Sequence, residues 1–548
     1  HKYASARSNH ILKFHSQLAM DIVEKDYQVT YDLVAKVGEL RYQDHRQLGE
    51  IRAYLKCSKA NIDLPLSTIA MIAKRYLILC KKLHEKNKDK ISMDIKMNGG
   101  YILHFDGSTE QRSGKISFVL KDSLSGHILL SEMIKSENFA EVKVLLEKVR
   151  DLFGNPLVIV SDLRHWFILV CQEVFGPDAL HILCHFHFLR TLKDLFVDDH
   201  MWIQNHLNHT CKLRLGIRSQ LQLLKDEKVV GSGNRTSKTI EEIKKNWLDS
   251  GGALVAYQQT LSWILQFKQD SSGKGMPFDL PYLDFSRRFM IGKKLINEIF
   301  SDKKTTNPGM RLKFYHNGFL KILQKMNKDS EGGKELKQRV RQLDYSKKWF
   351  AKLRGALFMG ATQENRDTLA PLSKRYGLTQ EEASKIPNNI ESYRKELKNE
   401  IACLNSKENK KQILSKFQKQ VEKHQKNLKV PFITVAIDGE TRIIIPPRTN
   451  NFLESSFRKD KATIRRQTGR SKLPREFGSV GALLPFYSSM KTHKTFKPYF
   501  ENKEMLAKEF AKLAEDEWKI PENVVGLPQR PLSGQVEPDL PEILALEG

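Results

Sequence analysis

The sequence predicts an α/β protein in which a mixed sheet flanked by helices is interrupted by a large all-α insertion and preceded by an all-α, basic region. Three observations support this prediction. Strand-like and helix-like segments alternate in residues 96–195, helical periodicity dominates residues 196–430, and a strand pair followed by a helix returns in residues 431–500. Residues 1–95 and a C-terminal helix with an extended tail, 501–548, complete the five predicted regions.

The composition indicates a folded, intracellular protein with a polyanionic partner. The 548 residues include 91 Lys and Arg against 64 Asp and Glu, a formal charge of +27, and 40% are hydrophobic. Such an excess of positive charge is typical of nucleic-acid-binding proteins, although a basic surface without that role stays open. The sequence contains no apolar run of the roughly 18 residues that a membrane span needs. Its six cysteines show no disulfide-like spacing.

Residues 1–95 are predicted to be helical. Asp44–Lys56 is amphipathic, and after a polar connection Ser67 is a suitable N-cap for a helix that continues to about Leu83. Two helices across a short connection, the second carrying Lys74 and Arg75, fit a helix-turn-helix DNA reader. They fit an ordinary helical hairpin nearly as well.

The segment Tyr101–Asp106 is predicted to be a buried strand that ends in a carboxylate, with Gly107 and Ser108 terminating it. Burial opposes the charge of an aspartate, so this side chain should be paired, hydrogen-bonded or bound to a metal. An aspartate that merely closes a turn is the alternative.

The rest of the alternating region supplies a second strand that ends in aspartate. Its predicted elements are a hairpin over 115–120 and 127–130, a helix over 138–153, a strand over 157–162, a helix over 166–175 and a strand over 181–184. If the first and fourth strands are parallel neighbours, Asp106 and Asp162 lie about 5 Å apart. A divalent cation is the usual answer to the repulsion of two such carboxylates.

A third carboxylate is expected on a helix near the C-terminal end. Strands 432–437 and 441–445 flank the turn Asp438-Gly439, and Asn450-Asn451 is a suitable N-cap pair for the helix that follows. Glu454 lies in the first turns of that helix. It shares a face with three basic residues, Arg458, Lys461 and Arg465.

These motifs together resemble a known family. Asp106 and Asp162, each at the end of a strand in this order of elements, resemble the two aspartates of an RNase H-like catalytic core. The run from Pro447 to Glu454 resembles the glutamate helix of DDE transposases. Cys184-His185-Phe186-His187 resembles the Cys-x-x-His motif of Mutator-like, hAT-like and related bacterial insertion-sequence transposases. The resemblance covers roughly residues 100–200 and 430–490 and implies an RNase H-like fold.

The resemblance also implies an activity and a set of site residues. Such enzymes nick DNA at transposon ends and join the freed 3′ ends to target DNA, using two Mg²⁺ or Mn²⁺ ions about 3.5–4 Å apart. Asp106 would bridge the ions, Asp162 and Glu454 would each hold one, and Cys184 and His187 would support the site. The partners would be the terminal inverted repeats and target DNA, bound by a homodimer or larger assembly. The protein would be intracellular and DNA-associated, with no membrane partner.

Basic and polar residues around the glutamate are the predicted DNA contacts. They are Arg448, Asn451, Arg458, Lys461, Arg465, Arg466 and Arg470. A solvated helix face, with Arg458 merely pairing Glu454, is the alternative.

Other interpretations stay open. The chain could be a transposase-derived DNA-binding protein without catalysis, or an RNase H-like nuclease without strand transfer. His187 could instead be hydrogen-bonded within the fold, and Trp166 could stack on a base or pack in the core. Cys184 and His187 could also join downstream residues in a zinc site. Those residues are His206, His209 and Cys211.

Overall fold

The computed structural model describes most of the chain in two compact units. The described residues are 2–4, 11–13, 29–58, 61–110, 114–226, 239–250, 252–267, 280–301, 310–327, 330–359, 377–405, 409–437, 440–490 and 506–518. The predicted turn at Asp438-Gly439 and the predicted tail from Ile520 lie outside them. Unit 1 consists of His1–Cys184 with Pro431–Gly548, and unit 2 is His185–Val430.

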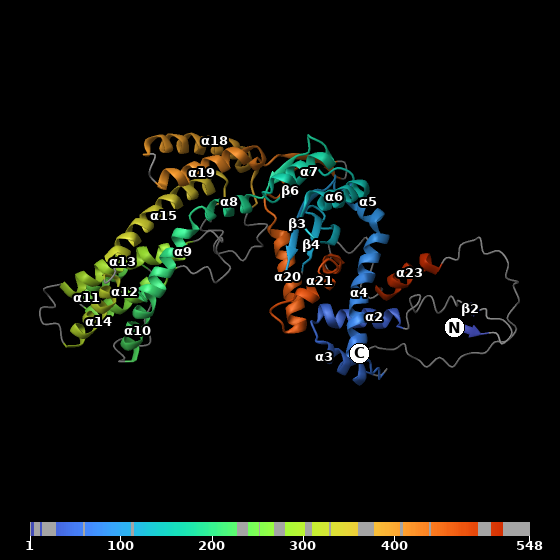
Figure 1. Cartoon of the computed structure of the whole chain (residues 1–548), viewed down its shortest axis with the longest axis horizontal. Helices are drawn as coiled ribbons and strands as arrows, with labels where there is room; N and C mark the ends of the chain where they lie inside the picture. The colour runs from blue at the N-terminus through green and yellow to red at the C-terminus, as the bar shows by residue number, and fades with distance from the viewer. Residues whose placement is uncertain are drawn as a thin grey trace. The chain divides into compact units, whose positions relative to one another are not determined.

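Unit 1 is a mixed α/β structure (Figure 1). Its strands are β1 (Lys2–Ala4), β2 (Ile11–Lys13), β3 (Ile102–Thr109), β4 (Ile116–Asp122), β5 (Ile128–Ile134), β6 (Val158–Ser161), β7 (His181–Leu183), β8 (Ile433–Ile437) and β9 (Glu440–Ile444). Its helices are α2 (Tyr31–Gly38), the π-helix η1 (Glu39–Gln43), α3 (Leu48–Cys57), α4 (Leu66–Lys86), α5 (Lys88–Met97), α6 (Phe139–Phe153), α7 (His165–Phe175), α20 (Asn451–Thr468), α21 (Pro474–Val480), α22 (Leu484–Met490) and α23 (Leu506–Trp518).

Unit 2 consists of helices in the part of it that the structure describes. They are α8 (His185–Asp194), α9 (Val197–Asn205), the π-helix η2 (His206–Thr210), α10 (Leu213–Asp226), α11 (Ile240–Ser250), α12 (Ala253–Leu265), α13 (Pro281–Ser301), α14 (Met310–Asn327), α15 (Ser330–Ala356), α18 (Gln380–Cys403), α19 (Asn409–His424) and the 3₁₀ turn η5 (Gln425–Leu428). Buried aromatic residues join them, as where the Phe196 ring lies 5.5 Å from that of Phe350 and 6.1 Å from that of Phe417. Among the helices described in either unit, none is both long and apolar enough to cross a membrane.

A five-stranded mixed sheet organises unit 1. The strand order is β5-β4-β3-β6-β7. The pairs β5–β4 and β4–β3 are antiparallel, whereas β3–β6 and β6–β7 are parallel. The condition on which the expected proximity of Asp106 and Asp162 depended, that the first and fourth strands are parallel neighbours, is therefore met. The predicted hairpin and the order of helices and strands in this region are confirmed as well.

The central strand is longer than the sequence predicted. β3 continues through Thr109, so the expectation that Gly107 and Ser108 terminate it is wrong. The reason is the antiparallel ladder with β4, which continues from Asp106 opposite Val119 to Thr109 opposite Ile116. The parallel pairing with β6 stops earlier, at His104. Asp106 thus lies within β3, but two residues beyond the last residue of β3 that pairs with β6.

The two faces of the sheet pack against different helices. Phe105 and its odd-numbered neighbour Leu103 belong to the large core that contains buried residues of α6 and α7. Successive side chains of a strand alternate between faces, so His104 and Asp106 point to the other side. There α20 packs: its Leu453 and Phe457 form a small core with Val119 of β4. Asp106 is therefore on the face that α20 covers.

The N-terminal helices share the large core with the sheet. Buried residues of α2, α3, α4 and α5 cluster with those of β3, α6 and α7. The ring of Tyr76 on α4 lies 6.1 Å from that of Tyr42, 5.7 Å from Tyr487 and 5.8 Å from Phe510. A Cβ on Gly38 would lie 2.1 Å from the Tyr76 ring, so α2 and α4 approach closely only because this residue is glycine. Helices from both ends of unit 1 thus pack around α4 (Figure 1).

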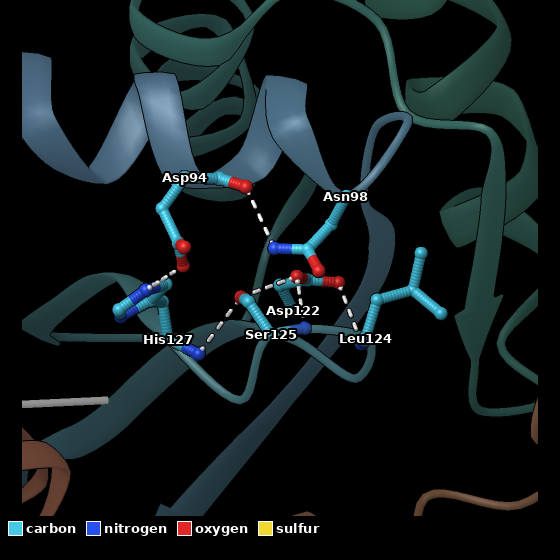
Figure 2. Close-up of polar contacts among 6 residues, drawn as sticks. All are labelled: Asp94, Asn98, Asp122, Leu124, Ser125 and His127. Atoms are coloured by element: carbon cyan, nitrogen blue, oxygen red, sulfur yellow. Dashed lines mark hydrogen bonds and ion pairs between the residues drawn. The ribbon is translucent and has the colours of Figure 1, made fainter. Parts of the chain in front are cut away.

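A buried aspartate holds the turn between β4 and β5 (Figure 2). The Asp122 carboxylate is fully buried. It accepts hydrogen bonds from the backbone N–H of Ile102, Leu124 and Ser125 at 2.8–2.9 Å and from the Ser125 hydroxyl at 2.5 Å. Next to it, His127 Nε2 lies 2.7 Å from the Asp94 carboxylate of α5. These bonds fasten the hairpin to the start of β3 and to α5, which is consistent with a purely structural aspartate.

Candidate active site

Asp106 and Asp162 come from adjacent parallel strands. The β3–β6 register pairs Ile102 with Val158 and His104 with Val160. Continued by two residues, it places Asp106 beside Asp162, which directly follows β6. Both residues are half-buried. By this extension the two residues belong to neighbouring positions on the same face of the sheet.

The helix that carries Glu454 is tied to β3 by the fully buried Asn450. Asn450 Nδ2 donates to the Phe105 carbonyl at 3.2 Å, and its Oδ1 lies 2.9 Å from Nδ1 of His104. Its backbone N–H donates to the Cys184 sulfur at 3.3 Å. Because Phe105 directly precedes Asp106 in β3 and Cys184 directly follows β7, these contacts fix the start of α20 at the end of the sheet where the aspartates lie.

The tautomer of His104 follows from this network. Since the Asn450 amide nitrogen donates to a carbonyl, the amide oxygen must be the acceptor, and His104 Nδ1 carries the proton. Burial lowers the pKa of His104 to about 3, although the bond to Asn450 opposes the shift and Lys121 adds to it. The imidazole is therefore neutral and acts as a fixed donor to α20.

Phe452 adds an apolar anchor in the first turn of α20. Its ring lies 4.6 Å from that of His104, edge to face, and the ammonium of Lys121 sits 5.1 Å from its centroid. Together with Leu453 and Phe457, it fixes the helix against β4 and β5. The rotation of α20 about its axis is thereby set, and with it the direction of Glu454.

The first turns of α20, which carry Glu454, lie beside β3. At its beginning α20 is bonded to Phe105, and eleven residues later Lys461 Nζ donates to the Thr109 carbonyl at 2.5 Å. The helix therefore runs beside β3 in the same direction. Glu454, four residues after Asn450 and two helical turns before Lys461, lies on the strand-facing side at the level of Asp106 and Gly107. Glu454 is itself half-buried.

The donor set suits a hard divalent cation. Asp106, Asp162 and Glu454 offer carboxylate oxygens, the ligands that Mg²⁺ and Mn²⁺ prefer. A carboxylate oxygen of Asp162 and the Cys184 sulfur lie within 4.8 Å of each other, whereas among the described residues the carboxylates of Asp106, Asp162 and Glu454 do not all lie within that distance. The Cys184 thiol is fully buried, and its bond from Asn450 supports the position of α20. His187 follows in α8, which belongs to unit 2.

The predicted DNA contacts divide into three groups. Arg458 and Arg466 are exposed on α20. Lys461 and Arg465 lie 3.5 and 3.7 Å from the Glu110 carboxylate, and Arg470 pairs with Glu476 at 2.9 Å. The third group, Arg448 and Asn451, is 2% and 7% exposed. Burial of these two side chains favours a role in holding the loop before α20 over a role in binding DNA.

The predicted helix-turn-helix pair has its second helix in the core. α3 and α4 pack against each other, but α2, α5, α22 and α23 also contact α4. One face of α4 is buried along its length, as at Ile69 and Leu83, and the other is open, with Met71, Lys74 and Glu85 exposed. The packing of four further helices on α4 suits a helical hairpin within a larger core, and a DNA-reading role for the open face stays a prediction.

Trp166 and the downstream residues of the alternative zinc site have contacts within the fold. The Trp166 ring lies 4.3 Å from that of Phe167 and 6.4 Å from that of Phe139, and it packs against the large core, as the packing alternative predicts. His206 Nε2 lies 3.3 Å from the Cys211 sulfur. Among the described residues, these two and His209 are not part of any cluster of three potential metal ligands, so the alternative zinc set is not assembled.

Three further residues lie at this site, and none of them was predicted from the sequence to belong to it. From the sequence, His104 was assigned only to an apolar strand, and Asn450 was predicted only as a helix N-cap. Glu137, in the connection between β5 and α6, was not considered, although its side chain is 11% exposed and lies against Gly107. Nothing in its local sequence distinguishes it from a surface glutamate near a helix start.

Comparison with known proteins adds no relative. No protein-family model matches the chain, and no curated protein matches it with significant similarity.

Proposed function

We propose that this protein is a DDE-type transposase that cleaves DNA at transposon ends and joins the ends to target DNA. One observation carries the proposal: the β3–β6 register brings Asp106 beside Asp162 on the sheet face along which α20 carries Glu454. Three carboxylates from segments far apart in sequence thus lie on elements that meet at the end of the sheet where β6 and β7 finish. Such an arrangement is costly without a cation.

The sheet supports the same proposal at the level of the fold. Three antiparallel strands followed by two parallel ones, in the order β5-β4-β3-β6-β7, are what an RNase H-like core requires. The sheet residues and α20 lie in unit 1, and a long helical segment separates them in sequence. The formal charge of +27 suits a double-stranded DNA partner.

The residues of the site have distinct roles in this proposal. Asp106, Asp162 and Glu454 would hold Mg²⁺ or Mn²⁺, which supplies a Lewis acid for the phosphoryl group and activates the attacking hydroxyl. Asn450, His104 and Phe452 keep Glu454 in place. Exposed Arg458 and Arg466 contact DNA phosphates, and these contacts position the strand without reading its sequence.

The test uses the purified chain and duplex oligonucleotides tiled across the DNA on both sides of its coding sequence. With Mg²⁺ or Mn²⁺, we expect nicks at two defined ends and joined products with a target plasmid. Glu454→Gln and Asp162→Asn should abolish both products and leave DNA binding within about twofold.

The other outcomes of this test each indicate a different function for the chain or contradict part of the proposal. Nicks without joined products indicate a nuclease, and DNA binding without nicks indicates a catalytically silent derivative. Full cleavage by Glu454→Gln removes that residue from the site. Absence of DNA binding at low salt refutes the proposal as a whole.

A further inference from the structure

Glu137 places a fourth carboxylate against the candidate site. A Cβ added to Gly107 would lie 2.6 Å from Oε1 of Glu137, so the carboxylate rests on the backbone one residue after Asp106. Burial raises the pKa of Glu137, the Arg164 guanidinium opposes the rise, and the Asp162 carboxylate adds to it. The glutamate therefore sits among Asp106, Asp162 and Arg164.

The partner of Glu137 is an arginine at the rim of the site. Arg164 Nη2 lies 2.5 Å from Oε2 of Glu137. Arg164 is the N-cap of α7, two residues after Asp162, and its guanidinium carbon is 5.8 Å from the centroid of the Phe167 ring. Half of the Arg164 side chain is exposed. One nitrogen of the guanidinium, Nη2, is thus held by Glu137, while half of the Arg164 side chain is still exposed to solvent.

This pair is poorly explained as a stabilising salt bridge. An ion pair with one exposed partner contributes only about 0–1 kcal/mol to stability. Placing the Glu137 carboxylate in a nearly buried position near Asp162 adds desolvation and repulsion. A fixed orientation of Arg164 is what the arrangement does provide. Guanidinium groups bind phosphate through paired N–H donors, and prior orientation reduces the entropy lost on binding.

We propose that Glu137 is a positioning residue that holds Arg164 at the edge of the carboxylate site, where the guanidinium binds a phosphate of the DNA strand being cut. This inference rests on the proposed function and adds to it two residues, neither of which is among the three carboxylates. The position of Glu137 also requires glycine at residue 107, because a larger side chain there would displace the Glu137 carboxylate.

The experiment compares Arg164→Ala, Glu137→Ala and the double variant on the oligonucleotide that the unchanged protein cuts. Each should raise KM for DNA about tenfold with a smaller change in kcat. Each should also reduce the slope of log Kd against log salt by about 1, the signature of one lost phosphate contact. The double variant should match Arg164→Ala, because both changes remove the same interaction. Arg164→Lys keeps the positive charge but lacks the paired N–H donors of the guanidinium. Its KM for DNA should therefore lie between those of the unchanged protein and Arg164→Ala.

Arg150→Ala is the matched control. Arg150 has 39% of its side chain exposed and pairs with Asp151 on α6, so its loss should change neither KM nor the salt slope. Melting temperatures of all variants identify any that fail to fold. Since Arg164 is half exposed, Arg164→Ala should fold even if Glu137→Ala does not.

The outcomes separate the inference from the proposed function. If the unchanged protein neither binds nor cuts DNA, the proposed function fails and the inference falls with it. If the unchanged protein cuts DNA and Arg164→Ala has the same KM and salt slope, the inference alone is wrong. If Glu137→Ala weakens Mn²⁺ binding in the absence of DNA and Arg164→Ala does not, Glu137 is a metal ligand and its positioning role is refuted.

Discussion

Asp106 and Asp122 lie on the same antiparallel strand pair and have opposite surroundings. Asp122, at the end of β4, is fully buried and accepts bonds from three backbone amides and one hydroxyl (Figure 2). Asp106, within β3, is half-buried and lies beside Asp162. Four protein donors bind the Asp122 carboxylate, whereas the Asp106 carboxylate accepts a bond from the backbone N–H of Gly107 at 2.8 Å. Burial with donors marks a structural aspartate, whereas convergence of carboxylates marks a candidate catalytic one.

The sharpest test of this contrast is Asp106→Asn. We expect DNA cleavage to fall at least about 10³-fold, which corresponds to about 4 kcal/mol in the activation barrier. The melting temperature should stay the same or rise, because the neutral amide relieves repulsion with Asp162. Steady-state cleavage assays and thermal melting measure the two effects. A large fall in melting temperature would place Asp106 in the structural class with Asp122.

Asp122→Ala should have the opposite profile. Removal of the carboxylate leaves several buried donors without an acceptor, and we expect a loss of about 3–4 kcal/mol in the stability of unit 1. Hydrogen exchange should accelerate at the amides of Leu124 and Ser125 before global unfolding. Asp151→Ala, an exposed aspartate on α6, is the control and should change neither quantity. Normal protection of the 122–127 turn in Asp122→Ala would show that its donors find other acceptors.

Asn450→Ala should affect both stability and activity. It removes the amide acceptor for His104 and the donor to the Phe105 carbonyl, at a cost of about 2–3 kcal/mol. Because the same contacts fix the start of α20, cleavage should also fall, by about 10–100-fold, with little change in DNA affinity. Asn155→Ala, on an exposed loop, provides the control. Stability loss with full activity would mean that Phe452 and Phe457 alone position Glu454.

Asp460→Asn should change stability in a pH-dependent way. Burial raises the pKa of Asp460 to about 7, although the hydrogen bond from Ser488 and the charge of Lys121 both lower it. Above its ordinary pKa the unfolded chain loses this proton before the folded chain does, so stability falls as pH rises from about 4 to 7 and then levels off. The amide introduced by Asp460→Asn stays neutral at every pH, so this variant should gain about 1–2 kcal/mol at pH 8 and nothing near pH 4.

Melting curves of the unchanged protein and Asp460→Asn between pH 4 and pH 8 measure this difference. Asp151→Asn should parallel the unchanged protein at every pH. A variant that is equally stable at pH 8 would show that the Lys121 ammonium already compensates the Asp460 charge.

Much of unit 1 could be predicted from sequence because its signals are local. The apolar run of β6, the turn residues at 122–126 and the N-cap Asn138 each depend on neighbouring residues. The order of the elements allowed the first and fourth strands to be parallel neighbours, and the structure shows that they are. The length of β3 was not predictable in this way, because its last residues are held by pairing with β4 and not by their own preferences.

By itself, the sequence determined which residues can do chemistry and on which kinds of element they lie. Only the tertiary structure decided their surroundings. It packed α2, α5, α22 and α23 against α4, buried Arg448, and set Glu137 against Gly107. Side-chain burial and hydrogen bonding depend on residues hundreds of positions away: the Asn450 amide accepts a bond from His104 and donates one to the Phe105 carbonyl. Periodicity and spacing carry no information about such partners, so the sequence could name Glu454 but not what holds it in place.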